Sequence, residues 1–308
     1  MKRVLVTGAS GFIGGHTLPL LLQAGYEVHA AARHIPTADP HLAVHWHQAD
    51  LLESTQVDRL FTAIAPTHLL HMAWVATPKL YWSSPDNLRW LQASLDLVQQ
   101  FELHGGQRMI VAGTCAEYDW RYGYLSEQVT PLQPTTLYGT SKNALQSVLS
   151  AYTQQKSDFS VAWGRMFFTF GPHEHPDRVV PYVIRALLKG ETARCSAGTQ
   201  VRDFLYVEDA AAAFVALLDS QVKGAVNVCS GRSSTLRQIL ELVATKLDRL
   251  DAVHFGAIPA SASEPNLLIG DTTRLNSEVG WSPAFSLDQA VQRTVDWWRE
   301  HLLERRTP

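Results

Sequence analysis

The amino-acid sequence predicts an α/β protein with a doubly wound parallel sheet and a smaller C-terminal α/β lobe. Three observations predict this class. Through the first half of the 308 residues, short runs rich in β-branched residues alternate with longer amphipathic stretches, as in repeated βαβ units. A glycine-rich turn separates the first such run from the first amphipathic stretch. Beyond residue 165 the alternation becomes irregular, and we expect the second lobe to begin there.

The elements of the first half follow from the spacing of apolar residues. Short alternating or continuous apolar runs predict strands, whereas apolar residues three and four positions apart predict helices. Strands are expected at residues 3–7, 27–32, 44–48, 68–73, 108–113 and 159–165, and helices at residues 12–24, 55–65, 87–104 and 136–156. Because helices separate most of these strands, the strands are expected to run parallel.

Composition narrows the class of protein. With 46% hydrophobic and 18% charged residues, the chain can bury a large core, which excludes wholesale disorder. The 26 basic and 29 acidic residues form no block of like charge, so we expect no nucleic-acid or membrane partner. Cys115, Cys195 and Cys229 are too far apart for a disulfide framework or a metal site. We therefore expect a cytoplasmic protein without a metal.

A glycine-rich run follows the first predicted strand and opens the first predicted helix. It reads Thr7-Gly8-Ala9-Ser10-Gly11-Phe12-Ile13-Gly14. Glycines so placed allow a tight turn and a close approach of the backbone to a pyrophosphate at a helix N-terminus. A turn that needs glycine for geometry alone is the alternative. The flanking strand and helix favour a Rossmann-like dinucleotide site, with contacts expected from Gly8, Ser10, Gly11, Phe12, Ile13 and Gly14.

The end of the second predicted strand bears on which dinucleotide binds. An acidic residue there would accept hydrogen bonds from the adenosine ribose of NAD, but the sequence reads Ala32-Arg33. A guanidinium can bind a 2′-phosphate, so Arg33 favours NADP, with NAD and a merely solvated arginine as alternatives. Asp50 and Leu51 after the third strand, and Ala73 after the fourth, are further expected cofactor contacts, although Asp50 could equally begin a helix.

A tyrosine and a lysine lie four positions apart at the start of the helix predicted at residues 136–156. This spacing places Tyr138 and Lys142 on one helix face. A nearby ammonium favours the phenolate, which suits Tyr138 to proton transfer at a carbinol or ketone. Thr114, at the end of the fifth predicted strand, could add a hydroxyl hydrogen bond to the reacting oxygen. The alternative is that Tyr138 and Lys142 are ordinary surface residues of the helix without a catalytic role.

Together these motifs resemble the extended short-chain dehydrogenases/reductases of the nucleotide-sugar epimerase/dehydratase group. The likeness also rests on Asn87 at a helix start, on Arg165 before Gly171-Pro172, and on the run from Arg202 to Asp209. It covers nearly the whole chain.

The resemblance implies roles for four residues. Tyr138 would be the acid/base, Lys142 would contact the nicotinamide ribose, and Thr114 would be the hydroxyl partner. Arg202 would bind the diphosphate of the substrate.

The resemblance also implies how the chain is organised. Residues 1–165 would bind NADP, residues 202–229 would return to this domain, and residues 166–201 and 230–308 would form the substrate lobe. The helices from Asn87 to His104 and from Thr136 to Lys156 would form a homodimer interface.

Several positions depart from the pattern of that family. Its dehydratases carry an Asp and a Glu where this chain has Cys115 and Ala116, which disfavours dehydration. The reductase-epimerases place a catalytic cysteine at the position of Ala116, so double epimerisation is unsupported. Phe168 replaces an asparagine and Ser261 stands near an expected arginine, and both of these family residues would help to bind the diphosphate. A modified nucleotide sugar, or a substrate without a nucleotide, therefore stays open.

Two further residues are expected near the substrate. Cys115 would form part of the pocket wall, since nothing nearby in sequence lowers its pKa. His173 would line the mouth of the site. The pairs His45/His47 and His173/His175 invite a metal hypothesis, but no third ligand recurs at a suitable spacing.

These observations favour an NADPH-dependent reductase of a keto sugar, with a nucleotide-linked 4-keto-6-deoxyhexose as the preferred substrate class. Arg33 and the absence of the dehydratase carboxylates support reduction. A nucleotide-sugar 4-epimerase would use the same residues and leave the cofactor unchanged overall. A non-catalytic protein that senses NADP is the alternative from another class.

Overall fold

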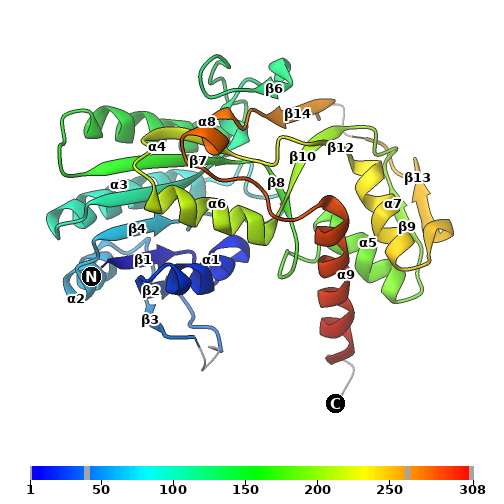
Figure 1. The fold of residues 1–308 in the computed structure, drawn as a ribbon, viewed down its shortest axis with the longest axis horizontal. Coiled ribbons are helices and arrows are strands. Elements are labelled where there is room, and N and C mark those ends of the chain that lie inside the picture. Colours follow the sequence, from blue (N-terminus) through cyan, green and yellow to red (C-terminus); the bar gives the residue numbers. More distant parts are fainter. Residues whose placement is uncertain (1, 38–41, 261–263, 305–308) are drawn as a thin grey trace.

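A seven-stranded parallel sheet forms the larger part of the molecule (Figure 1). The computed structural model describes residues 2–37, 42–260 and 264–304. The strand order is β11-β7-β5-β4-β1-β2-β3, and every neighbouring pair is parallel. The bounds are β1 (Arg3–Thr7), β2 (Glu27–Ala32), β3 (Val44–Gln48), β4 (His68–His71), β5 (Arg108–Thr114), β7 (Ser160–Met166) and β11 (Gly224–Val228).

Helices cover both faces of this sheet, because alternate strand residues point to opposite sides. Val4 and Val6 belong to one apolar core with α1 (Phe12–Gln23) and α6 (Val207–Asp219). Leu5 between them belongs to the other core, with α2 (Ser54–Ile64), α3 (Asp86–Leu103) and α4 (Leu137–Thr153).

A smaller lobe is built around β10, the central strand of a second sheet in the order β12-β10-β14-β6. Its strands are β6 (Tyr124–Leu125), β8 (Phe168–Phe170), β10 (Val201–Tyr206), β12 (Ser233–Thr235) and β14 (Leu267–Gly270), and β9 (Ala193–Cys195) pairs with β13 (Val253–Phe255). Three helices, α5 (Val179–Leu188), α7 (Leu236–Lys246) and α9 (Leu287–Glu304), share its apolar core, while α8 (Thr273–Ser277) packs on β11. The doubly wound sheet with a smaller α/β lobe is thus confirmed.

The chain crosses between the two sheets more than once. β10 belongs to the second sheet, yet α6 packs on α1 and β11 pairs with β7 at the edge of the large sheet. β6 belongs to the first half of the chain but pairs with β14 in the second sheet. Residues far apart in sequence therefore meet where the two sheets adjoin (Figure 1).

Element ends differ from the predicted ranges by a few residues. β4 ends at His71, two residues early, because its partner β1 ends at Thr7, which pairs with His71, and the chain turns away at Gly8. The helix expected at residues 136–156 begins at Leu137, with Thr136 as its N-cap: the Thr136 hydroxyl accepts from the N–H of Gly139. No described helix is long and apolar enough to cross a membrane.

Leu88 and Leu103 on α3 and Val148 on α4 are exposed apolar side chains. If these helices pair across a homodimer, Val148→Glu should shift the protein to a monomer, because it would bury a charge in that interface. Light scattering after size-exclusion chromatography measures this, with Val129→Glu on an exposed loop as the control. A wild-type monomer would contradict the expectation.

Candidate active site

The glycine turn brings three segments of backbone into close contact. The N–H of Gly11 donates to the Gly8 carbonyl at 2.9 Å. Gly8 has a φ of +68°, and a Cβ there would lie 2.7 Å from the amide nitrogen of Ala73. A Cβ on Gly14 would lie 2.2 Å from the Gly8 carbonyl oxygen. Only glycine allows β1, α1 and the end of β4 to approach so closely.

This cradle fits a dinucleotide. Gly11 is the N-cap of α1 with no side-chain cap, and the first turn contains no acidic residue, so its N–H groups can bind a pyrophosphate. A cavity of about 320 Å³ leads from the turn to the ends of β4 and β5. Its lining includes Gly8, Gly11, Phe12, Ile13, Gly14, Ala73, Trp74, Tyr81, Thr114, Tyr138, Lys142 and Arg178.

Thr114, Tyr138 and Lys142 all line this one cavity, as their expected joint role requires. The Thr114 hydroxyl oxygen accepts from the N–H of Ala116 at 3.2 Å, which leaves the hydroxyl proton free to be donated. The Lys142 ammonium donates to the Ala112 carbonyl at 2.8 Å.

Trp74, which follows β4, lies directly against the side chain of Lys142. The Lys142 Nζ is 3.9 Å from the centroid of the Trp74 ring. The Trp74 indole donates to the Asn87 side-chain carbonyl at 2.8 Å, and the Asn87 amide donates to the Tyr81 carbonyl at 2.7 Å. Asn87 therefore fixes the ring that supports the lysine.

Burial governs the proton affinities of the Tyr138–Lys142 pair. It raises the pKa of Tyr138 above its usual range, Tyr81 raises it further, and a hydrogen bond from Thr114 lowers it. Burial lowers the pKa of Lys142 to about 7, against the opposing effect of Glu117. Since a ring face attracts a cation, Trp74 supports the charged form of the lysine.

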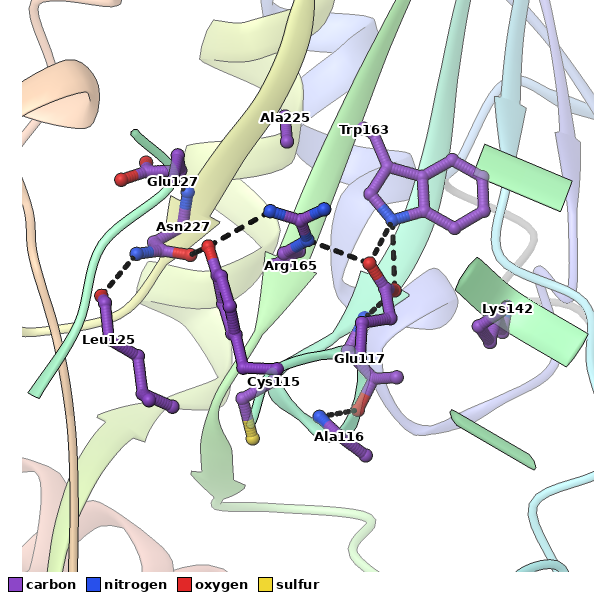
Figure 2. Close-up of polar contacts among 12 residues, drawn as sticks. Cys115, Ala116, Glu117, Leu125, Glu127, Lys142, Trp163, Arg165, Ala225 and Asn227 are labelled. Atoms are coloured by element: carbon purple, nitrogen blue, oxygen red, sulfur yellow. Dashed lines mark hydrogen bonds and ion pairs between the residues drawn. The ribbon is translucent and has the colours of Figure 1, made fainter. Parts of the chain in front are cut away.

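A buried polar network surrounds the side chain of Glu117 (Figure 2). The carboxylate of Glu117 is fully buried and forms an ion pair with Arg165 of β7, the Nε donating at 2.7 Å. The same carboxylate accepts from the indole of Trp163 and from the N–H of Thr114. Sequence reasoning missed Glu117, although an acid directly after an apolar strand was a usable signal.

The residues expected around the adenosine lie at the same edge of the sheet but outside the cavity. Arg33 is exposed just after β2, and Ser10 is exposed in the glycine turn. Leu51 is buried. The Asp50 carboxylate accepts from the N–H of Leu52 at 3.0 Å.

Residues expected near the substrate fall in different places. Arg202 lines a second cavity with Trp82, Trp120 and Phe168, and its guanidinium donates to Glu264 at 2.9 Å. Ser261 lies outside the described residues.

Cys115 and His173 do not line the cavity that holds Tyr138. Cys115 is buried, and burial raises the pKa of its thiol to about 12. His173 packs against the ring of Trp297, with centroids 4.6 Å apart. Among the described residues, no group of three or more His, Cys, Asp or Glu could hold a metal ion.

The fold and this cavity define an α/β dinucleotide-binding enzyme class with a Tyr/Lys pair at the carboxyl edge of the sheet. The sequence pattern of the NAD dependent epimerase/dehydratase family matches residues 4–229. The chain belongs to that family, which identifies it as an extended short-chain dehydrogenase/reductase.

Relatives with known activities carry out different reactions. The chain is 28% identical to GDP-6-deoxy-D-mannose reductase of Pseudomonas aeruginosa, over 98% of this chain and 99% of the relative. It is 27% identical to UDP-glucuronic acid decarboxylase 1 of Xenopus tropicalis, over 98% and 73%. The structure of Thermus thermophilus UDP-glucose 4-epimerase in complex with NAD is 28% identical, with a TM-score of 0.84 and coverage of 96% and 99%.

Trp74→Leu should weaken dinucleotide binding about tenfold, because a desolvated cation–π contact contributes roughly 1 to 2 kcal/mol to holding Lys142 charged and in place. Fluorescence titration with NADPH and NADH measures this. Trp90→Leu is the matched control, since Trp90 stacks on Trp74 at 6.2 Å. Equal losses in both variants would show that Trp74 acts only through packing.

Glu174 should make stability depend on pH. It is 9% exposed, and burial raises its pKa to about 8, so the folded state holds its proton more tightly than the unfolded state. Stability from this group is complete below about pH 4 and is lost as the pH rises through 8. Relative to wild type, Glu174→Gln should gain at least about 1 kcal/mol between pH 5 and pH 9.

Urea unfolding at the two pH values measures this difference. Glu191→Gln, at an exposed position, is the control. A constant difference between wild type and Glu174→Gln would contradict the expectation.

Proposed function

We propose that this protein is an NADPH-dependent reductase of a keto sugar. The observation that carries the proposal is that Thr114, Tyr138 and Lys142 line one cavity with the glycine turn. A hydroxyl donor, a phenol and an ammonium converge where a carbonyl oxygen would gain charge.

The chain's own residues account for proton transfer. When bound, NADPH supplies the hydride. Thr114 donates its free hydroxyl proton in a hydrogen bond to the carbonyl oxygen, which orients the ketone. Tyr138 donates its phenolic proton to that oxygen as negative charge develops. Lys142, held by the Ala112 carbonyl and Trp74, stabilises the resulting phenolate.

Arg33 supports NADPH over NADH. It follows β2 at the edge of the sheet that carries the glycine turn, and the strand ends in Ala31-Ala32 without a carboxylate. Within the described part of the chain, Arg33 has no ion-pair partner. An exposed guanidinium can bind a 2′-phosphate in a bidentate arrangement.

The substrate is a nucleotide-linked 4-keto-6-deoxyhexose in this proposal. The full-length likeness to a GDP-6-deoxy-D-mannose reductase supports it. The absence of the dehydratase carboxylates, with Cys115 and Ala116 in their place, supports reduction over elimination.

A nucleotide-sugar 4-epimerase is the second candidate. The likeness to the T. thermophilus UDP-glucose 4-epimerase favours it, since that protein was solved with NAD. The same Tyr138, Lys142 and Thr114 would serve, and the cofactor would end unchanged.

The experiment follows nicotinamide absorbance when NADPH and a panel of nucleotide-linked 4-keto-6-deoxy sugars are offered, with NADH in parallel. One sugar should be reduced with stoichiometric loss of NADPH. Tyr138→Phe should abolish turnover and retain NADPH binding, because it removes only the transferable proton. Arg33→Gln should raise KM for NADPH about tenfold and leave that for NADH unchanged.

Other outcomes point to the alternatives. Inversion at C4 of a nucleotide sugar without net oxidation would identify the epimerase. NADPH binding with no turnover by either reaction would favour the sensing protein.

A further inference from the structure

The carboxylate of Glu117 is shared among donors from three places in the chain. Thr114 donates its N–H at 2.8 Å, Trp163 its indole N–H at 2.9 Å, and Arg165 its Nε–H at 2.7 Å. Glu117 is 0% exposed and the Arg165 side chain is 2% exposed. A carboxylate can be buried this deeply only where donors such as these satisfy its oxygens.

Two hydrogen bonds lock the short segment that presents the Thr114 hydroxyl. Glu117 accepts from the N–H of Thr114, and the Thr114 hydroxyl accepts from the N–H of Ala116. The first fixes the backbone of Thr114 and the second fixes its side-chain rotation. Glu117 thus controls where Thr114 points its proton, although it does not line the cavity.

Arg165 extends the network to the second sheet (Figure 2). It donates to the Tyr118 hydroxyl at 3.0 Å, and that hydroxyl donates to the Asn227 side-chain carbonyl at 2.7 Å. The Asn227 amide donates to the carbonyls of Leu125 in β6 and of Asp271 after β14, at 2.9 and 3.2 Å. The position of Thr114 is therefore tied to the small lobe.

The negative charge of Glu117 also acts on the catalytic pair. It disfavours the phenolate of Tyr138 and favours the ammonium of Lys142. The other titratable groups that face this pair or its neighbours are Cys115, Tyr81, His71 and, beside Tyr81, Arg178. Glu117 differs from these groups because it is a carboxylate paired with a buried arginine, Arg165.

We propose that the Glu117–Arg165 pair is a positioning device for Thr114 and that the charge of Glu117 contributes to the pH range in which Tyr138 transfers its proton. The inference rests on the proposed function, because it assigns Tyr138 and Thr114 their roles at a carbonyl. It assigns two separate roles to the Glu117 side chain. Its length places Thr114, and its charge changes the proton affinity of Tyr138.

Glu117→Gln tests the charge. The amide keeps the length and an acceptor for the Thr114 N–H. Removing a nearby negative charge makes proton loss easier from either member of the Tyr138–Lys142 pair, so both apparent pKa values fall. The pH–kcat profile should move to lower pH by at least about 0.5 unit.

Glu117→Asp tests the position. It keeps the charge but withdraws the carboxylate by about 1.5 Å, one carbon–carbon bond, from the Thr114 N–H. We expect kcat to fall about tenfold or more, with KM for NADPH and the position of the pH profile unchanged.

Glu127→Gln is the matched control. Glu127 is a partly buried acid of the same network, where it accepts from the N–H of Asn227 at 2.7 Å. It is not among the charges that act on Tyr138 or Lys142. This variant should show any general loss of stability without a shift in the pH profile.

The double variant Glu117→Gln/Arg165→Met covers the case in which Glu117→Gln leaves Arg165 unpaired and unfolds the chain. It removes both buried charges together. Its pH profile should shift in the same direction but by less than that of Glu117→Gln, because the loss of the Arg165 charge has the opposite effect on Tyr138. If Glu117→Gln and the double variant move the profile no more than Glu127→Gln does, the charge role is overturned. If Glu117→Asp retains the kcat of wild type, the positioning role is overturned.

A titration without turnover separates failure of this inference from failure of the proposed function. Tyrosinate absorbance of the NADP⁺-loaded protein, minus that of the Tyr138→Phe variant, follows the ionisation of Tyr138 directly. Glu117→Gln should lower its midpoint even if no keto sugar is reduced. An unchanged midpoint would overturn the charge role of Glu117 while leaving the reductase assignment intact.

Discussion

The structure at the carboxyl edge of the large sheet, where Thr114 lies, depends on the burial of one carboxylate, that of Glu117. An unpaired Glu117 would cost several kcal/mol, so the chain must bring donors to it. These donors are Thr114 at the end of β5 and Trp163 and Arg165 on β7, two neighbouring strands of the large sheet. The strand register therefore decides where Thr114 lies, and through Asn227 it also places the second sheet.

The cofactor side of the cavity depends on a different constraint, which is close backbone contact. Gly8 and Gly14 let α1 approach β1 and the end of β4, so that the glycine turn faces the segment of Ala73 and Trp74. Trp74 in turn supports Lys142 from below, and Asn87 holds Trp74. The glycine turn and the Trp74 ring that supports Lys142 thus lie in one continuous wall of the cavity.

The substrate side is where this chain departs from the pattern of its family. Arg202, expected to bind a diphosphate, is almost fully buried, donates to Glu264 and lies over the ring of Phe168 at 5.2 Å. An arginine already paired with a carboxylate must give up that partner to bind a phosphate. Arg202 lies on β10 of the second sheet, whereas Tyr138 and Lys142 lie on α4, which packs on β5 and β7 of the large sheet.

The sequence by itself determined the parts of this protein that depend on local spacing. Strand alternation, helix periodicity, the glycine turn and the interval between Tyr138 and Lys142 are all set within a few neighbouring residues, and each was predicted. Element ends were less certain, as at β4, because the end of that strand is set by the end of its neighbour β1 at Thr7.

Tertiary structure alone decided which distant residues meet. The pairing of Glu117 with Arg165, of Trp74 with Lys142 and of Arg202 with Glu264 joins positions 48, 68 and 62 residues apart. No periodicity within one element encodes such pairs, because they follow from the order and register of strands in two sheets.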